Sequence, residues 1–300
     1  MLARLQKIIV LTVLAAACIW LIAFWRDTPA LALVGAAVIV LGYSVMLALE
    51  FVLLRLTHQG GLTPPPGWGE LAHAWAAETI AAARVFCWWQ PFRSHAVPDR
   101  LTPDVNAQRR RGVVLVHGFV CNRAVWTLWL RHLRARRQVF VAVNLEPIFG
   151  VIDDYAPIIE DAVQRVTQAT GLPPLLVCHS MGGLAVRAWL RAANGYDRVH
   201  HIVTLGTPHH GTWLARFGTG ANARQMRIGC DWQHQLEHDL PAQQRSLFTC
   251  WYSNCDNIVF PASTATLAGA DNRLLPGVAH VQLALDATVM RDTLDEFGAA

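Results

Sequence analysis

The chain has 300 residues, enough for a catalytic domain of roughly 200 residues and an additional segment. Apolar residues make up 53% and charged residues 15%, whereas ordinary soluble domains are roughly one-quarter charged, so we expect part of the chain to meet lipid. The formal charge of +4 is modest, and the arginines at 109–111 and 131–137 lie in no nucleic-acid motif, which excludes a nucleic-acid partner.

The cysteines give little sign of a metal site or a disulfide framework. The seven cysteines show no paired metal-ligand spacing, and their odd number leaves at least one of them unpaired. This pattern favours a reducing compartment. A disulfide from Cys230 to Cys250 or Cys255 stays open as an alternative. We expect neither a metal nor an organic cofactor.

Two apolar stretches near the amino terminus, Ile8 to Trp25 and Ala30 to Leu49, contain no charged residue. Each is about long enough to cross the roughly 30 Å hydrocarbon core of a bilayer as a helix. The short connection Arg26 to Pro29 forces a hairpin, so residues 1–57 are predicted to form two transmembrane helices. A cleaved signal peptide is the rival for the first stretch. It is disfavoured because the second stretch follows at once and no small-residue cleavage site is present.

The positive charges near these stretches predict an orientation. Arg4 and Lys7 precede the hairpin and Arg55 follows it, whereas Arg26 in the connecting loop is offset by Asp27. Loops on the cytoplasmic side carry the excess of Lys and Arg. We therefore expect both ends of the hairpin, and the rest of the chain, on the cytoplasmic side of a bacterial inner membrane.

Residues 58–111 are predicted to be a linker followed by an amphipathic helix. The segment from Gly60 to Gly67 is rich in Gly and Pro and cannot continue a helix. Trp68 to Trp89 is then predicted to be helical, with few polar positions among Ala, Leu and Trp. Two placements are open for this helix, against the bilayer surface or packed on the catalytic domain.

From residue 112 to residue 300 the pattern changes to short apolar strands that alternate with amphipathic helices, which predicts an α/β domain with a mainly parallel sheet. The expected strands are Val113–Val116, Val139–Asn144, Leu175–Cys178, His201–Leu205 and Leu247–Tyr252. The expected helices are Asn122–Arg137, Ile152–Thr170 and Gly182–Ala193.

The strand Leu175–Cys178 leads directly into His179-Ser180-Met181-Gly182-Gly183 and then a helix, which places Ser180 on a sharp strand-to-helix turn. At this point the chain resembles the alpha/beta-hydrolase family, and within it the bacterial lipases and esterases, from about Gly112 to the end. One departure is Cys178, which stands where the family's Gly-x-Ser-x-Gly motif has its first glycine. The resemblance implies that Ser180 is a nucleophile.

The resemblance also implies an oxyanion hole. Val113 to Phe119 is an apolar strand followed by a His-Gly loop, and in similar hydrolases this loop supplies one backbone donor. The N–H groups of Phe119 and Met181 are therefore expected to stabilise the tetrahedral oxyanion. We expect His117 to hold the loop, and Cys121 and Asn122 to shape it rather than react.

In this family the acid and then the histidine follow the serine along the chain. Asp256 comes just after the last predicted strand, in a segment similar to the acid-bearing turn of bacterial lipases, and His280 precedes the C-terminal helix. We assign Asp256 as the orienting acid and His280 as the general base. A turn-capping aspartate and a surface histidine are the alternative interpretations. The rival acids are Asp231, Asp239 and Asp271.

Two further segments are expected near the site. Gly206 to Thr212 is similar to the Gly-Thr-Pro-His-x-Gly segment of lipases, so His209 and His210 are expected to form part of the site wall. Residues 213–245 occupy the place where lipases carry a lid, although an ordinary connecting helix explains them as well.

Together these features predict a membrane-anchored serine hydrolase that cleaves carboxylic esters of lipid-like or apolar substrates. An acyltransferase that uses the same triad is one alternative. A catalytically idle hydrolase fold that serves as a membrane scaffold is the other.

Overall fold

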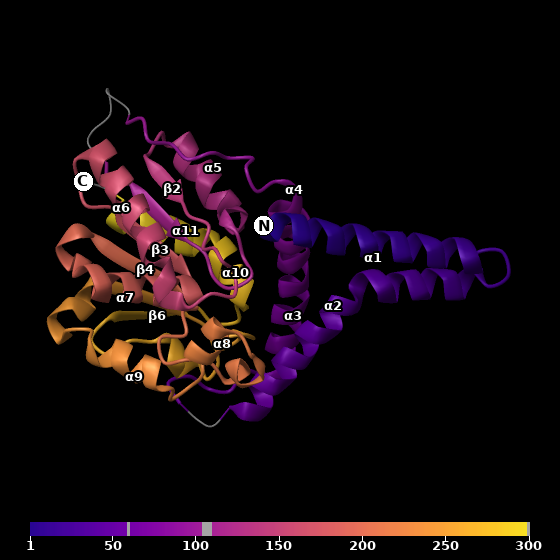
Figure 1. The fold of residues 1–300 in the computed structure, drawn as a ribbon. Helices are drawn as coiled ribbons and strands as arrows, with labels where there is room; N and C mark the ends of the chain where they lie inside the picture. Colours follow the sequence, from indigo (N-terminus) through magenta and orange to yellow (C-terminus); the bar gives the residue numbers. More distant parts are fainter. Residues whose placement is uncertain (59–60, 104–109, 299–300) are drawn as a thin grey trace.

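The computed structural model describes residues 1–58, 61–103 and 110–298, and Figure 1 shows their arrangement. Residues 59–60 and 104–109 of the predicted segment 58–111, which include Arg109 of the first arginine cluster, and the last two residues of the predicted catalytic domain lie outside the described residues.

Two long helices, α1 (Leu2–Phe24) and α2 (Pro29–Thr57), form a hairpin that projects away from the rest of the molecule (Figure 1). Both are long and apolar enough to cross a membrane. Most of their large apolar side chains are exposed, as expected of helices whose natural surroundings are lipid. The predicted stretch Ala30 to Leu49 is thus helical over its whole length, and Ile8 to Trp25 is helical as far as Phe24.

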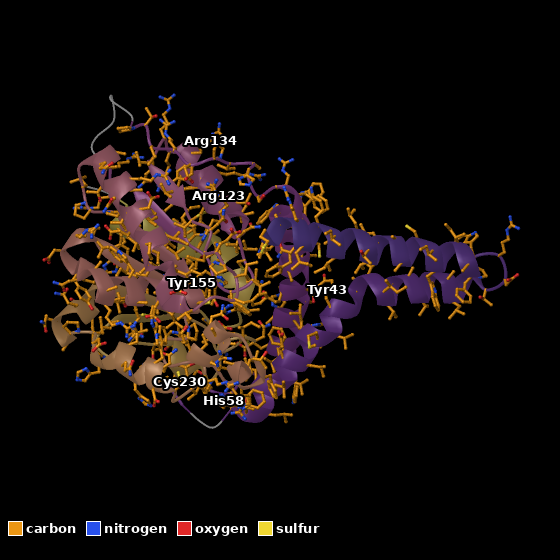
Figure 2. The ribbon with its side chains drawn as sticks, in the orientation of Figure 1. Tyr43, His58, Arg123, Arg134, Tyr155 and Cys230 are labelled. Carbon is orange, nitrogen blue, oxygen red and sulfur yellow. The ribbon has the colours of Figure 1, made fainter. Side chains whose placement is uncertain are left out.

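A third helix lies between the hairpin and the α/β domain of residues 112–298, which is predicted to be catalytic and is called the catalytic domain below. Helix α3 (Trp68–Ala82) continues through the π-helical turn η1 (Ala83–Trp89) into the short α4 (Gln90–Phe92), and in Figure 1 it runs across the direction of the hairpin. The Tyr43 hydroxyl of α2 donates to the Thr79 carbonyl of α3 at 2.9 Å, and Figure 2 shows Tyr43 at this junction. Of the two placements left open by the sequence, the structure has α3 packed on the catalytic domain.

The catalytic domain has a six-stranded parallel sheet in the order β2-β1-β3-β4-β5-β6. Its strands are β1 (Val113–Val116), β2 (Phe140–Ala142), β3 (Leu175–His179), β4 (His201–Leu205), β5 (Phe248–Tyr252) and β6 (Asp271–Leu274). The predicted parallel sheet is therefore confirmed. The edge strand β6 was not predicted, because its mostly exposed Asp-Asn-Arg-Leu sequence lacks an apolar run.

Helices cover both faces of the sheet. On one face, Ile159 of α6 (Ala156–Thr170) and Leu184 of α7 (Met181–Ala193) pack with Val114. On the other, Leu133 of α5 (Thr127–Ala135) and Leu283 of α10 (His280–Leu285) pack with Val113 together with α11 (Ala287–Phe297). Successive β1 side chains thus enter opposite cores, which explains why this strand is apolar throughout. The shorter helical segments are η2 (Arg123–Trp126), η3 (Ile152–Tyr155), η4 (Gly195–Arg198), η5 (Trp213–Phe217), α8 (Ala221–Gln225), α9 (Asp231–His238), η6 (Ala242–Leu247) and η7 (Ala262–Ala265).

The segment 213–245 contains η5, α8, α9 and part of η6, and it packs on the domain rather than standing off it. Leu236 of α9 is buried in the same core as α7, and the Trp232 indole donates to Asp153 at 2.8 Å. These contacts are those of a connecting segment, and its mobility as a lid stays a prediction.

Candidate active site

Ser180 lies on the turn between β3 and α7 with φ 56° and ψ −131°, a conformation that non-glycine residues rarely adopt. The turn is held from both sides, since the Ser180 N–H donates to the Leu205 carbonyl at 2.9 Å and the Thr207 hydroxyl donates to the Ser180 carbonyl at 2.9 Å. A Cβ on Gly182 would lie 2.4 Å from the Val116 carbonyl oxygen, so this position requires glycine. The local sequence thus forms a sharp elbow that presents the serine.

The loop after β1 passes close to the serine. A Cβ on Gly118 would lie 2.6 Å from the Ser180 Cβ, so only glycine allows this approach. Within the described part of the chain, the N–H groups of Phe119 and Met181 donate to no acceptor. Two backbone donors next to Ser180 are therefore free to receive an oxyanion.

His117 connects this loop to the strand β2 region. Its Nδ1 donates to the Gly118 carbonyl at 2.9 Å, and its Nε2 accepts from the Leu145 N–H at 3.0 Å. Burial lowers the pKa of His117 to about 4, so the ring is neutral, as these two bonds require. Both ring nitrogens are occupied in holding the loop.

Asp256, in the loop after β5, and His280, the first residue of α10, contact each other. His280 Nδ1 donates to Asp256 Oδ2 at 2.9 Å, and both side chains are buried. The second carboxylate oxygen of Asp256 accepts from the N–H groups of Ile258 and Val259 at 2.9 and 2.7 Å. Gly206 (φ +55°) lies alongside, where a Cβ would come within 2.7 Å of Asp256 Oδ2. The arrangement fixes the carboxylate against the imidazole.

The rival acids lie elsewhere. Asp239 faces Arg191 at 3.6 Å, Asp271 pairs with Arg273 at 2.6 Å, and Asp231 begins α9. None of these three, all within the described chain, contacts His280.

The backbone of His280 is held as firmly as its side chain. Its N–H donates to the Asn257 side chain at 3.2 Å, and His179 Nε2 donates to its carbonyl at 3.0 Å. Burial would lower the pKa of His280, but the charge and hydrogen bond of Asp256, helped by Glu78, raise it above the ordinary value. Burial lowers the pKa of His179 to about 3, so that ring is neutral.

Neither Ser180 Oγ nor His280 Nε2 bonds another group of the described chain, and both residues line one cavity.

Sequence reasoning did not find the role of Glu78. This residue of α3 is fully buried, and its carboxylate accepts from the N–H groups of Val281 and Gln282 at 2.8 and 3.2 Å, at the start of α10. Burial raises its pKa to about 7, against the lowering effect of these bonds and of His280. The signal was present in the sequence as a carboxylate within a helix otherwise rich in Ala, Leu and Trp.

Helix α2 also reaches the site. Glu50 Oε2 accepts from the Asn257 side chain at 2.6 Å, and Asn257 in turn accepts from the His280 N–H. The hairpin, α3 and the catalytic domain therefore share one network of hydrogen bonds around the histidine.

The cavity in front of Ser180 has a volume of about 260 Å³. Side chains of α2 (Leu47), of α3 and η1 (Ala82 and Phe86) and of the catalytic domain (Phe119 and Ile258) give it a largely apolar wall. Burial raises the pKa of Cys121, which also lines it, to about 12, so the thiol stays protonated.

Two segments expected at the site lie away from this cavity. None of its lining residues, all in the described chain, comes from 213–245 or from the pair His209 and His210. His209 is buried behind the sheet end, where its ring contacts Thr204 at 3.1 Å. The expectation that the two histidines form the site wall is thus replaced by a wall from α2 and α3.

The described residues contain no group of three or more His, Cys, Asp or Glu side chains placed to hold a metal ion. All seven cysteines are free, including Cys230, Cys250 and Cys255.

A parallel sheet with a strained serine after β3, and with an Asp–His pair whose members follow β5 and β6, defines a hydrolase of the α/β type. Residues 113–292 match the alpha/beta hydrolase family, and the chain belongs to it.

Solved structures with the same fold include the mature form of the Bacillus licheniformis lipase BlEst2, at 16% identity and a TM-score of 0.55, covering 66% of this chain and 94% of that one. Another is Aspergillus fumigatus lipase B, at 18% identity and a TM-score of 0.53, covering 66% of this chain and 56% of that one. At these identities the likeness concerns the fold.

Proposed function

We propose that the protein is a membrane-anchored serine hydrolase that cleaves carboxylic esters of lipid-like or apolar acyl substrates. The observation that carries the proposal is the buried Asp256–His280 pair at 2.9 Å, which shares one apolar cavity with the strained Ser180. Hydrolase activity of the lipase or esterase kind agrees with the family and with the lipases of similar fold.

The geometry supports acyl transfer in two steps. Ser180 Oγ attacks the ester carbonyl carbon while His280 Nε2 takes the hydroxyl proton, and the N–H groups of Phe119 and Met181 stabilise the oxyanion. Collapse of the tetrahedral intermediate breaks the ester bond between the carbonyl carbon and the alcohol oxygen. The alcohol leaves with the proton from His280. Water then attacks the acyl-serine with the same base, and the carboxylic acid is released. Asp256 keeps His280 in the tautomer that this requires. The chemistry needs no cofactor.

The position of the cavity along α2 supports a substrate that resides in a bilayer. At about 1.5 Å per residue, α2 rises about 27 Å between Pro29 and Leu47, close to the roughly 30 Å hydrocarbon thickness. Leu47 lines the cavity and Glu50 follows one turn later. With the hairpin in a membrane, Ser180 therefore lies near the level of the lipid ester groups.

The charges support a cytoplasmic catalytic domain. Arg4, Lys7 and Arg55 lie at the end of the hairpin that carries the domain, whereas the tip has Arg26 beside Asp27. The inner membrane of a bacterium fits this arrangement.

The decisive experiment compares wild type, Ser180→Ala and Ser246→Ala on a panel of ester, thioester and amide substrates. Ser246 is an exposed serine of η6 and serves as the matched control. We expect Ser180→Ala to lose labelling by an active-serine reagent and several orders of magnitude of ester turnover, while Ser246→Ala keeps both. Near-normal turnover in folded Ser180→Ala would refute the mechanism.

The same panel separates the alternatives. Transfer of the acyl group to an added alcohol or thiol in preference to water would identify an acyltransferase. A folded wild-type protein that is not labelled at Ser180 would identify an idle scaffold.

A further inference from the structure

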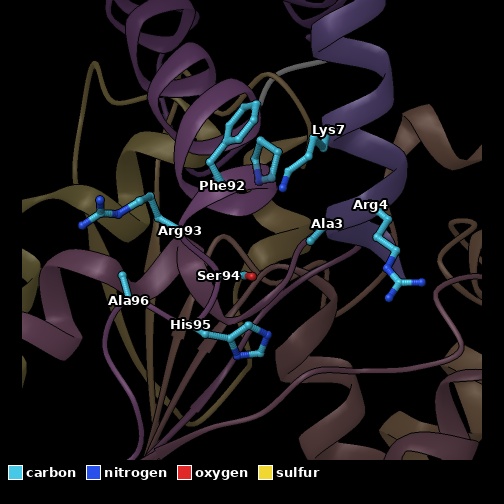
Figure 3. A pocket seen from close by; sticks show the side chains of 9 residues that line it. Ala3, Arg4, Lys7, Phe92, Arg93, Ser94, His95 and Ala96 are labelled. Carbon is cyan, nitrogen blue, oxygen red and sulfur yellow. The ribbon is translucent and has the colours of Figure 1, made fainter.

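A second cavity, of about 450 Å³, lies where the start of α1 meets the chain that follows α4. Figure 3 shows its side chains, with Arg4 and Lys7 coming from α1 and Arg93 and His95 from the other segment. Residues that are more than 80 positions apart in the sequence thus bring two arginines, one lysine and one histidine to the lining of a single cavity, and in Figure 3 the Arg4 and Arg93 guanidinium groups lie on opposite sides of it.

These cations lack the acidic partners that other arginines of the protein have. Arg123 pairs with Asp99 at 2.6 Å and Arg198 with Glu160 at 2.6 Å. No carboxylate lines the basic cavity, and in the described chain Arg4, Lys7 and Arg93 form no ion pair.

One acidic group does lie at this end of α1. Glu146 contacts the Met1 amino group at 3.1 Å, so it neutralises the terminus rather than the cavity. Because no carboxylate lies in the lining to compensate these basic side chains, their combined charge would attract an anion to the cavity.

The cavity lies at the end of a membrane-facing helix. Lys7 immediately precedes the apolar stretch of α1, and its Nζ lies 5.3 Å from the centre of the Phe92 ring. The centre of the Phe92 ring lies 5.5 Å from that of the Trp88 ring, and Trp88 is 54% exposed. Aromatic rings and basic side chains in this arrangement are typical of the level of the lipid headgroups.

We propose that this basic cavity binds the phosphate of an anionic phospholipid headgroup from the leaflet that faces the catalytic domain. The proposal rests on the membrane-spanning hairpin of the proposed function but not on its ester chemistry. Free phosphate has the same charge chemistry, yet the apolar rings beside the cations and the position at the hydrocarbon boundary favour a lipid as its source.

The test uses the full chain in neutral detergent, titrated with short-chain phosphatidylglycerol, short-chain phosphatidylcholine and inorganic phosphate, with binding followed by the thermal unfolding midpoint. The cluster variant Arg4→Gln/Lys7→Gln/Arg93→Gln is compared with Arg131→Gln/Arg134→Gln. The latter removes exposed charges from α5, at residues that do not line the basic cavity; Figure 2 labels Arg134.

We expect phosphatidylglycerol to raise the midpoint of wild type and of the α5 variant, and to bind the cluster variant at least about tenfold more weakly. Phosphatidylcholine should have no comparable effect on any of them. Single variants at Arg4 and at Arg93 give intermediate losses and keep the comparison valid if the triple variant fails to fold.

Equal binding of phosphatidylglycerol by wild type and the cluster variants would overturn the proposal, as would equal loss in the α5 variant. An equal response to inorganic phosphate would identify a free-phosphate site instead. Because binding is measured without ester turnover, each of these failures leaves the catalytic proposal standing.

Discussion

Replacing Glu78 with Gln should change how stability depends on pH. The folded-state pKa of Glu78 is about 7 against an ordinary value of 4.5, because burial disfavours its ionised form. The unfolded chain therefore gives up this proton at lower pH than the folded chain, and the folded state loses stability as pH rises from about 4.5 to about 7.

The size of the effect follows from the shift. A shift of about 2.5 pKa units corresponds to a total change of about 3 kcal/mol in the free energy of unfolding. About 2–3 kcal/mol of this stability is lost between pH 5 and pH 8. For a chain of this size, that lowers the thermal midpoint by about 5–10 °C. Gln cannot ionise, so Glu78→Gln should lack this part of the decline. The substitution also removes a charge that raises the pKa of His280. A raised histidine pKa likewise makes the folded state lose stability as pH rises, so this second loss should also be smaller in Glu78→Gln.

The assay measures thermal midpoints of wild type, Glu78→Gln and Glu70→Gln at pH 5, 6, 7 and 8 in one detergent. Glu70 lies in the first turn of the same helix and accepts from the Asn254 side chain at 2.9 Å, whereas Glu78 accepts from N–H groups of α10. Its variant should keep the wild-type slope. If the thermal midpoints of wild type and Glu78→Gln changed with pH in parallel, burial would not raise the pKa of Glu78 in the folded protein.

Three other predictions follow from the site and the hairpin. Asp256→Asn should keep the fold but lower ester turnover by roughly four orders of magnitude, while Asp271→Asn stays near wild type; the reverse result would reassign the acid. Gly206→Ala brings a Cβ to 2.7 Å from the Asp256 carboxylate, so turnover should fall by about 100-fold. Gly69→Ala, with no atom within 4 Å of the added Cβ, should not change turnover, and equal rates in both variants would contradict the steric argument. A reporter active only in the cytoplasm, fused after residue 300, should be active; activity of only an exported reporter would reverse the orientation.

The parts of the site that could be predicted from the sequence are those whose geometry depends on residues close together along the chain. The strand before Ser180 and the glycines after it define an elbow within a few residues, and the same holds for the loop at Phe119. The contact between Asp256 and His280 spans 24 positions, and its expectation came from the resemblance rather than from periodicity. Their catalytic roles stay predictions.

The contacts that the amino-terminal helices make with the site could not be predicted from local sequence. Glu78 bonds the N–H of Val281 across 203 positions, and Glu50 bonds Asn257 across 207. Such pairings depend on how whole elements pack, and helical periodicity shows only that α3 has a polar residue on an apolar face. The edge strand β6 was missed for a related reason, because its pairing with β5 is carried by backbone groups rather than by an apolar pattern.

The packing of α3 limits how this enzyme can be simplified. A shortened chain that begins at Gly112 would retain the whole family match but would lose Glu78 and leave the N–H groups of Val281 and Gln282 without their acceptor. It would also uncover the core face on which Val85 is buried. Under the proposed function, the hairpin does more than anchor the protein, because Leu47 of α2 lines the cavity beside Ser180. Replacing the hairpin with another membrane segment would change the wall of this cavity, and we expect the choice of substrate to change with it.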